Sequence, residues 1–249
     1  MTTGSTRGHN QAGVVTHYDD VINPEHQTGL WRTCPLVAIA SSPTIAFDYN
    51  ESFHSYDATD DWTLTQAVAG TAAISTTAPG TLDIDSNSVT VTQGVNLQNL
   101  NACFVPAANK SIWFEARIQV DEALTAELFI GLCASDTTII GTSAMTTNNR
   151  IGFQCVTDDG VLLFDSDKAG TGTTGTGTTL VEDTNVDLGF HYDGVADTVQ
   201  AYVNGVTVGS AIATANIPKL AIFPSFVCQS DGTQDPILKV QGFRCVQLK

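Results

Sequence analysis

The chain has 249 residues, of which 42% are hydrophobic and only 14% are charged, so it can bury a sizeable core. Lysine and arginine total 10 against 26 aspartates and glutamates, and the formal net charge of −16 disfavours binding to nucleic acids and to anionic membranes. No apolar run reaches the ~18 residues of a transmembrane helix, and the first residues lack the apolar stretch of a signal peptide.

The first 45 residues differ from the rest of the chain, because they show little periodicity and contain several prolines and turn residues. One apolar patch, residues 30–39, interrupts them. We interpret residues 1–45 as an extended N-terminal arm whose patch packs onto a partner, because aromatic and arginine side chains dominate interface energies. Alternatively, the patch packs on its own domain as an ordinary first strand. The predicted partner-binding residues are Leu30, Trp31, Arg32 and Leu36.

Residues 46–249 form the second predicted domain, because short strand-like runs and turns alternate throughout them. In residues 112–120, Phe114, Ala116 and Ile118 face one way, while Glu115 and Arg117 face the other. This period of two is typical of a half-buried antiparallel strand. Further strands are expected in residues 128–133, 151–156, 161–164, 186–192, 220–228 and 237–248.

Turn residues join several of these strands into hairpins. The pair Asn204-Gly205 stands between two alternating runs and favours a type I′ turn, in which both residues need a positive φ. The run Asp158-Asp159-Gly160 is a second hairpin signal. Gly242, inside the last strand, indicates a bulge or a close backbone approach.

Two segments lack a strand pattern. Residues 168–179 alternate glycine and threonine, a composition that cannot bury a core, and we expect a flexible surface loop there. Residues 121–128 fit either two helical turns or a polar loop. Because other helical signals are nearly absent, about ten to thirteen short strands predict an all-β protein, an antiparallel β-sandwich or jelly roll.

The strands resemble a known fold. Residues 111–134, with Ser-Ile-Trp-Phe-Glu-Ala-Arg-Ile-Gln-Val and Leu-Phe-Ile-Gly-Leu-Cys-Ala, look like two neighbouring strands of the concanavalin A-like lectin/glucanase sandwich. Residues 187–209 are similar to the Asp-Gly turn and Val-x-x-Tyr-Val-Asn-Gly hairpin of laminin-G-like modules. The resemblance implies a concanavalin A-like jelly roll over residues 46–249. Because that fold hosts glycosidases, lectins and structural modules, it does not determine the function.

A narrower resemblance is to tailed-bacteriophage virion proteins of this fold. It is carried by general similarity in residues 47–53, 61–64, 110–117 and 129–132 rather than by a diagnostic motif. Such proteins are often capsid decoration proteins or other structural proteins, so this resemblance implies a structural role in a virion.

Catalytic patterns are missing from the sequence. Glucanases of this fold carry Glu-x-Asp-x-x-Glu or Glu-x-Asp-x-Glu on one strand, and neither motif occurs here. Asp187 and Asp193 share a strand face, but six residues of strand separate them by ~20 Å, too far for a glycosidase pair. We expect Asp187 to begin a strand and Asp193 to form a turn. The sequence therefore predicts no catalytic residues and no enzyme.

Metal and cofactor sites are also not predicted. His17, Asp19, Asp20 and His26 form a conceivable metal site, but their spacing has no specificity and solvated loop residues are the preferred interpretation. The acids of residues 158–159, 165–167 and 231–235 could bind Ca²⁺, but turn formation and solubility are the preferred interpretation. The six cysteines form no CxxC pair, and we interpret them as buried thiols rather than disulfides.

These observations predict a protein that acts by binding. Our leading hypothesis is a non-enzymatic capsid decoration or cement protein, assembled onto the virion in the host cytoplasm. Its partners would be the major capsid protein or other virion proteins, and it would form a homo-oligomer. The alternative is a lectin-like carbohydrate-binding module, free or displayed on a virion, with a glycan as its partner. A glycoside-active enzyme ranks third, because the acid pair is missing.

Overall fold

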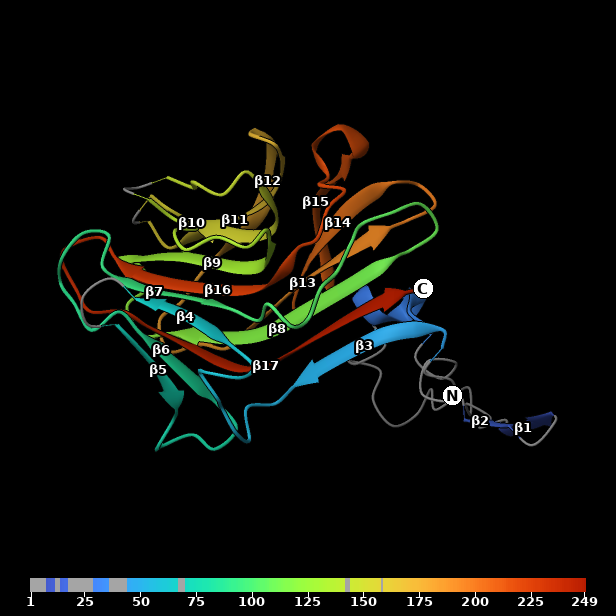
Figure 1. The fold of residues 1–249 in the computed structure, drawn as a ribbon, viewed down its shortest axis with the longest axis horizontal. Helices are drawn as coiled ribbons and strands as arrows, with labels where there is room; N and C mark the ends of the chain where they lie inside the picture. Colours follow the sequence, from blue (N-terminus) through green and yellow to red (C-terminus); the bar gives the residue numbers. More distant parts are fainter. Residues whose placement is uncertain are drawn as a thin grey trace, which may run out of the picture.

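The protein is an all-β antiparallel sandwich in which two sheets stack face to face (Figure 1). The computed structural model describes residues 8–11, 14–17, 29–35, 44–66, 70–141, 144–157 and 159–249, the first two segments and Thr214 by their backbone alone. Along these residues no helix is long and apolar enough to cross a membrane. The fold class expected from the alternating sequence pattern is thus confirmed.

The first sheet has seven strands in the order β12-β11-β10-β9-β16-β7-β4, and neighbouring strands are antiparallel. Its outer side is partly covered by the β9–β10 connection. In chain order its strands are β4 (Thr63–Gln66), β7 (Gly94–Gln98), β9 (Ala126–Cys133), β10 (Asn149–Cys155), β11 (Val161–Lys168), β12 (Thr171–Thr179) and β16 (Phe223–Ser230).

The second sheet has the order β15-β14-β13-β8-β17-β6-β5, and β3 pairs with the C-terminal half of β17. Figure 1 shows β3 beside β17, at whose end the C-terminus lies. The strands are β3 (Ala46–Glu51), β5 (Thr71–Ile74), β6 (Leu82–Asp85), β8 (Ile112–Val120), β13 (Val186–Asp193), β14 (Thr198–Val203), β15 (Val206–Ala213) and β17 (Ile237–Leu248). The remaining elements are the hairpin β1 (Gly8–Gln11) and β2 (Val14–His17) and the 3₁₀ helices η1 (Leu30–Thr33) and η2 (Thr214–Asn216).

The core lies between the sheets, where inward side chains of both layers meet. The predicted inward side chains of β8, which include Phe114 and Ile118, are fully buried. Across the layers, the rings of Phe226 on β16 and Phe243 on β17 meet edge to face with centroids 5.3 Å apart. Burial of such rings is the main stabilising contribution to a sandwich of this kind. Trp62 also belongs to this core.

The predicted turns are present. Asn204 and Gly205 have φ values of 49° and 73° and connect β14 to β15, as a type I′ turn requires. Gly160, with φ 68°, lies in the connection from β10 to β11. Gly242, with φ 148°, marks a register shift between β17 and β8, and a Cβ there would lie 2.9 Å from the carbonyl oxygen of Glu51. The predicted bulge is therefore confirmed.

The glycine- and threonine-rich segment is a strand, so the prediction of a flexible loop was wrong. Residues 171–179 form β12, which pairs with β11 in antiparallel register. Threonine favours strands, and β11 offers a complete edge to pair with. The glycines permit close approach, because a Cβ on Gly177 would lie 1.7 Å from the carbonyl oxygen of Leu162. Residues 121–125 form a turn, and β9 begins at Ala126, so this segment is not helical.

All six cysteines are free thiols in the structure. Five are buried and Cys103 is exposed. Burial raises the pKa of Cys34 to about 12 and that of Cys133 to about 12, because a thiolate is poorly solvated in the interior. These thiols therefore behave as small apolar side chains.

Candidate functional site

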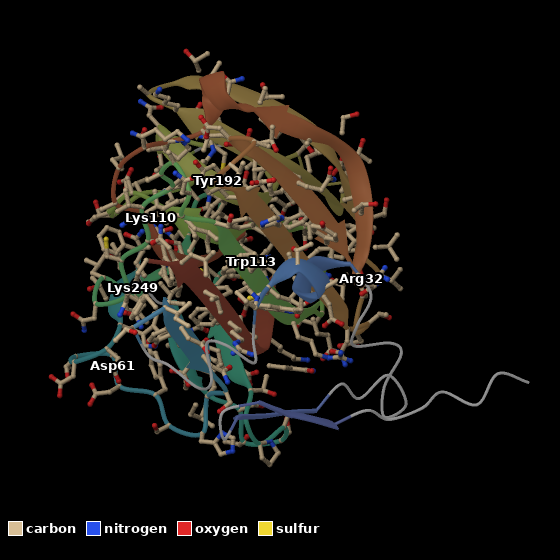
Figure 2. All side chains as sticks on the ribbon, turned by 90° about the vertical axis from the view of Figure 1, so that its right-hand side faces the viewer. Arg32, Asp61, Lys110, Trp113, Tyr192 and Lys249 are labelled. Carbon is tan, nitrogen blue, oxygen red and sulfur yellow. The ribbon has the colours of Figure 1, made fainter. Side chains whose placement is uncertain are left out.

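Part of the predicted arm packs against the sandwich. Figure 2 shows η1 lying over the outer face of the eight-stranded sheet, beside Trp113. Leu30 is fully buried there among Trp113, Val246 and Tyr202. Glycine makes room for it, because a Cβ on Gly189 would lie 2.6 Å from Cδ2 of Leu30. This apolar contact fixes η1 to strands that lie far away in the sequence.

Two further close contacts determine how η1 lies on the sheet. Gly29 has φ 76° and crosses the β14–β15 turn so closely that a Cβ would lie 1.7 Å from the carbonyl oxygen of Gly205. At the other end of η1, Nε1 of Trp113 donates a hydrogen bond to Oγ1 of Thr33 over 3.1 Å. The segment is thus held at both ends as well as in the middle.

Trp31 projects from η1 and is held by two charged residues of the sheet. Its Nε1 donates a hydrogen bond to Oε2 of Glu115, on β8, over 2.5 Å. The guanidinium of Arg244, on β17, lies over its ring at 5.3 Å from the centroid. Two hydrogen bonds to Asp48, of 3.0 and 2.7 Å, fix Arg244 and raise its pKa. The indole is therefore half-buried in a defined orientation.

An open groove of about 760 Å³ lies beside Trp31 on the same face of the sheet. Arg117 occupies its floor, where Nη1 lies 3.2 Å from Oδ1 of Asp187 and Nε donates to Oε1 of Gln241 over 3.0 Å. Gln241 in turn donates to Asn185 over 2.7 Å. The groove is lined by Trp31, Asn50, Glu51, Ser52, Glu115, Arg117, Asp187, Asn204, Gly205, Gln241, Gly242, Phe243 and Arg244.

Three carboxylates line the groove, and each accepts hydrogen bonds from its own chain. Glu51 accepts from the backbone N–H of Phe53 over 2.8 Å, Glu115 accepts from Trp31, and Asp187 accepts from Arg117. These contacts hold the three carboxylates in fixed orientations at the edge of the groove. The arrangement offers fixed hydrogen-bond acceptors and donors beside an aromatic ring, which is suited to binding hydroxyl groups.

Around β7, β9 and β16, the outer face of the seven-stranded sheet is covered by the β9–β10 connection. Side-chain amides of Asn96, Gln98 and Gln229 donate to backbone carbonyls of residues 137, 134 and 141 in the β9–β10 connection. Ile139 and Ile140 of that connection pack on Phe129 and neighbouring side chains. A cleft of about 220 Å³ remains there. We therefore take the groove beside Trp31 as the candidate site.

The four residues predicted to bind a partner have different positions. Leu30 is buried within its own chain, Trp31 lines the groove, and Arg32 is exposed. Leu36 lies outside the described residues. Residues 29–35 thus lie against the sandwich, as the alternative of packing on the same domain requires, although as a 3₁₀ turn rather than a strand. Partner binding by this segment and the boundary at residue 45 remain predictions.

Sequence reasoning missed most of the groove. Two signals pointed to it: Trp31 was selected for its residue type, and the alternation of residues 112–120 placed Glu115 and Arg117 on one outward face. Nothing local indicated that Gln241 and Arg244 of β17, or Asp187 of β13, would join them. Asp187 does lie at the start of its strand, and Asp193 caps the following turn through the N–H groups of residues 195 and 196, as expected.

The acids considered for Ca²⁺ have structural partners, and Asp165 and Asp167 lie in β11 rather than in a loop. Asp165 and Asp167 pair with Arg150 at 2.6 and 3.8 Å. Asp235 accepts from Ser86 and Ser88, while Asp231 accepts from Thr233. Within the part of the chain that the structure describes, no group of three His, Cys, Asp or Glu side chains could hold a metal ion. Asp158 and the side chains of the segment 17–26 lie outside it.

The comparisons with known proteins identify the fold. No protein-family model and no curated protein sequence matches the chain. Among solved structures, peanut lectin with a nine-residue peptide is 14% identical, with a TM-score of 0.59 over 82% of this chain and 98% of the lectin. Lectin I of Ulex europaeus, in complex with the methyl glycoside of α-L-fucose, is 10% identical, with a TM-score of 0.58 over 81% and 98%. An endo-1,3-β-glucanase from Streptomyces sioyaensis is 12% identical, with a TM-score of 0.55 over 84% and 98%.

This chain has the lectin-like jelly-roll fold. The expected concanavalin A-like sandwich is thereby confirmed as a fold, since lectins and a glucanase both align over most of the chain. At these identities the similarity shows architecture alone. These three structures give no support to the narrower resemblance to bacteriophage virion proteins.

Proposed function

We propose that the protein is a non-enzymatic carbohydrate-binding module, and that the groove beside Trp31 is its binding site. The observation that carries the proposal is the fixed indole next to a polar floor formed by Glu115, Arg117 and Gln241. Sugars present hydroxyl groups at their edges and C–H groups on their faces. A site with charged and amide groups beside an aromatic ring complements both.

The similar structures give the proposal general support. The Ulex europaeus lectin binds a fucoside, and the winged bean acidic lectin, with a TM-score of 0.53, binds a galactoside. Lectins thus predominate among these similar structures. The capsid decoration hypothesis has no such support and remains a prediction from the sequence. Carbohydrate binding needs a polar groove of the size of a sugar, whereas binding to a capsid surface does not. The groove therefore distinguishes the two functions.

A glycan array tests the proposal with three matched proteins. The wild type should bind a defined set of glycans, and Trp31→Ala should lose that binding. Lys239→Ala is the control, because Lys239 belongs to the same strand as Gln241, pairs with Asp183 at 3.6 Å and lies outside the groove. This control should retain wild-type binding. A blank array, or Trp31→Ala binding like the wild type, would refute the proposal.

Hydrolysis is the second activity to measure, because Glu115 and Asp187 lie in one groove. Glu115 faces Gly189 across β8 and β13, and Asp187 faces Arg117, so the two acids are diagonal neighbours. Diagonal neighbours on one face of a sheet are ~7–8 Å apart, so their carboxyl groups are near enough for the hydrolysis test to be needed. We expect no turnover of the bound glycans. Turnover that disappears in Glu115→Gln would instead identify a glycosidase.

A further inference from the structure

The groove crosses the strands of the sheet. At one end lie Asn204 and Gly205, in the β14–β15 turn, and at the other end lie residues 50–52 of β3 and its end. Between them the floor passes over β13, β8 and β17 through Asp187, Arg117 and Gln241. Four spacings separate β14 from β3, and at ~4.8 Å per spacing the groove is ~19 Å long.

The charges of the groove are largely compensated inside the protein. Arg117 pairs with Asp187, Arg244 pairs with Asp48, and Glu115 accepts the indole N–H. Three carboxylates and two guanidinium groups line the groove, and the whole chain carries a net charge of −16. An anionic ligand would therefore meet a repulsive field and no unpaired cation in the floor.

Neutral polar groups supply the remaining hydrogen-bonding capacity. The amides of Asn50, Asn204 and Gln241 line the groove and carry both donors and acceptors. They occur near both ends and in the middle, so the polar surface continues along the whole length. Trp31 is the aromatic side chain at the side of this path, and η1 holds it there.

We propose that the groove binds an uncharged linear oligosaccharide that lies across β13, β8 and β17, rather than a single sugar or an acidic glycan. One pyranose unit spans roughly one strand spacing of ~4.8 Å, so the groove takes about four units. Trp31 packs against one of these units, and Arg117 and Gln241 bind the hydroxyl groups at its edge. This inference rests on the proposed function and specifies the ligand class of the same site.

The inference makes chain length the decisive variable. A monosaccharide would contact about a quarter of the groove, and each further unit would bring another set of polar contacts without new ordering of the protein. Affinity should therefore rise from one unit to about four and then stop rising, when added units extend beyond the ends of the groove. A site for one terminal sugar would show no such rise.

Calorimetric titration of the full chain tests this. The probes are maltose-, cellobiose- and laminaribiose-based oligomers of increasing length, glucose as the single unit, and oligogalacturonates of matched lengths as the acidic set. At least one neutral series should bind more than tenfold better as the tetramer than as glucose, and the acidic set should bind more weakly. Gln241→Ala should weaken tetramer binding at least fivefold, whereas the control Lys239→Ala should leave it unchanged.

Each outcome has a distinct meaning. Glucose binding as tightly as the tetramer, or oligogalacturonate binding more tightly than the neutral series, would overturn the inference while leaving carbohydrate binding intact. If no saccharide on the array or in these series binds, the proposed function itself fails. Trp31→Phe is the second variant, in case Trp31→Ala detaches η1 from the sheet. Phenylalanine keeps an aromatic ring at the site but lacks the N–H group that donates a hydrogen bond to Glu115.

Discussion

Nε1 of Trp31 donates a hydrogen bond to Oε2 of Glu115 over 2.5 Å, although 84 positions separate the two residues in the sequence. The contact joins a short 3₁₀ turn near the N-terminus to the middle of β8. It also places an aromatic ring at the side of the groove whose floor Arg117 occupies. The site therefore depends on how residues 29–35 pack on the sheet.

The space for Leu30 gives a first prediction. Gly189→Val should displace η1, because any Cβ at this position meets Leu30 at 2.6 Å and the backbone oxygen of Phe114 at 2.8 Å. We expect a loss of ~1–3 kcal/mol in the free energy of unfolding, as for other overpacked sites, together with weaker glycan binding. Urea denaturation and calorimetric titration measure the two effects.

A matched glycine variant controls for the loss of backbone freedom. A Cβ on Gly175, in β12, would meet only the carbonyl oxygen of Phe164, at an ordinary contact distance of 3.7 Å. Gly175→Val should therefore keep both stability and glycan binding. If Gly189→Val is as stable as the wild type and binds glycan equally well, Leu30 does not position the site.

Two ion pairs of different burial give a second prediction. The side chains of Arg150 and Asp165 are 10% and 1% exposed and lie 2.6 Å apart. Arg150→Ala leaves a buried aspartate unpaired, so we expect it to lower the free energy of unfolding by ~3–5 kcal/mol. Arg117→Ala breaks a pair whose side chains are 51% and 34% exposed, and the expected cost is below ~1 kcal/mol. Chemical denaturation of both variants compares them directly, and equal costs would contradict this account.

The pH dependence of stability gives a third prediction. His191 stacks on Trp113 with ring centroids 4.7 Å apart, and burial lowers its pKa, since the charged imidazolium loses solvation. The unfolded chain therefore binds a proton at a higher pH than the folded chain does. The contribution of His191 to the free energy of unfolding is therefore fully present above the pKa of the unfolded chain, ~6.5, and it decreases as the pH falls below that value.

The variant His191→Gln isolates this contribution. Denaturation curves of the wild type and the variant are measured at several pH values between 5 and 8. Both proteins share the same acidic residues, so the pH dependence that these residues cause cancels in the difference between the two proteins. The wild type should lose more stability than the variant as the pH decreases. Parallel pH profiles would show that His191 does not titrate differently in the folded state.

Thiol labelling gives a fourth prediction. Of the six cysteines, Cys103 is exposed and the other five are buried. A chromogenic disulfide reagent at pH 8 should react with one thiol per chain quickly and with six after denaturation. Cys103→Ser should abolish the fast phase. Two or more fast thiols in the wild type would mean that a buried cysteine, such as Cys34 at the C-terminal end of η1, is accessible in the native state.

The sequence was most informative where local chemistry decides the structure. The alternation in residues 112–120, the positive φ at Asn204 and Gly205 and the bulge at Gly242 each follow from short-range rules, and all three are present. The prediction for residues 171–179 was wrong because it rested on their composition alone and did not consider a partner strand. Glycine and threonine form a strand there because β11 supplies the hydrogen bonds and the glycines allow close approach.

The candidate site was less predictable, because it is built from long-range pairings. Trp31 was selected for its residue type, but its position beside Glu115 depends on the glycines at 29 and 189. Arg244 reaches the indole only because β17 pairs with β8 in a register that places Arg244 opposite Glu115. Periodicity shows which face a residue occupies, but it does not show which strand lies beside it.

The most direct test of the site observes the tryptophan side chains during sugar binding. The chain has three tryptophans, and hence three indole N–H signals in a ¹⁵N-resolved NMR spectrum, which single Trp→Phe variants assign. On titration with the neutral oligosaccharide that binds best, the Trp31 signal should shift strongly, while the signal of Trp62, in the core, should stay in place. A sugar that binds without moving the Trp31 signal would contradict the account.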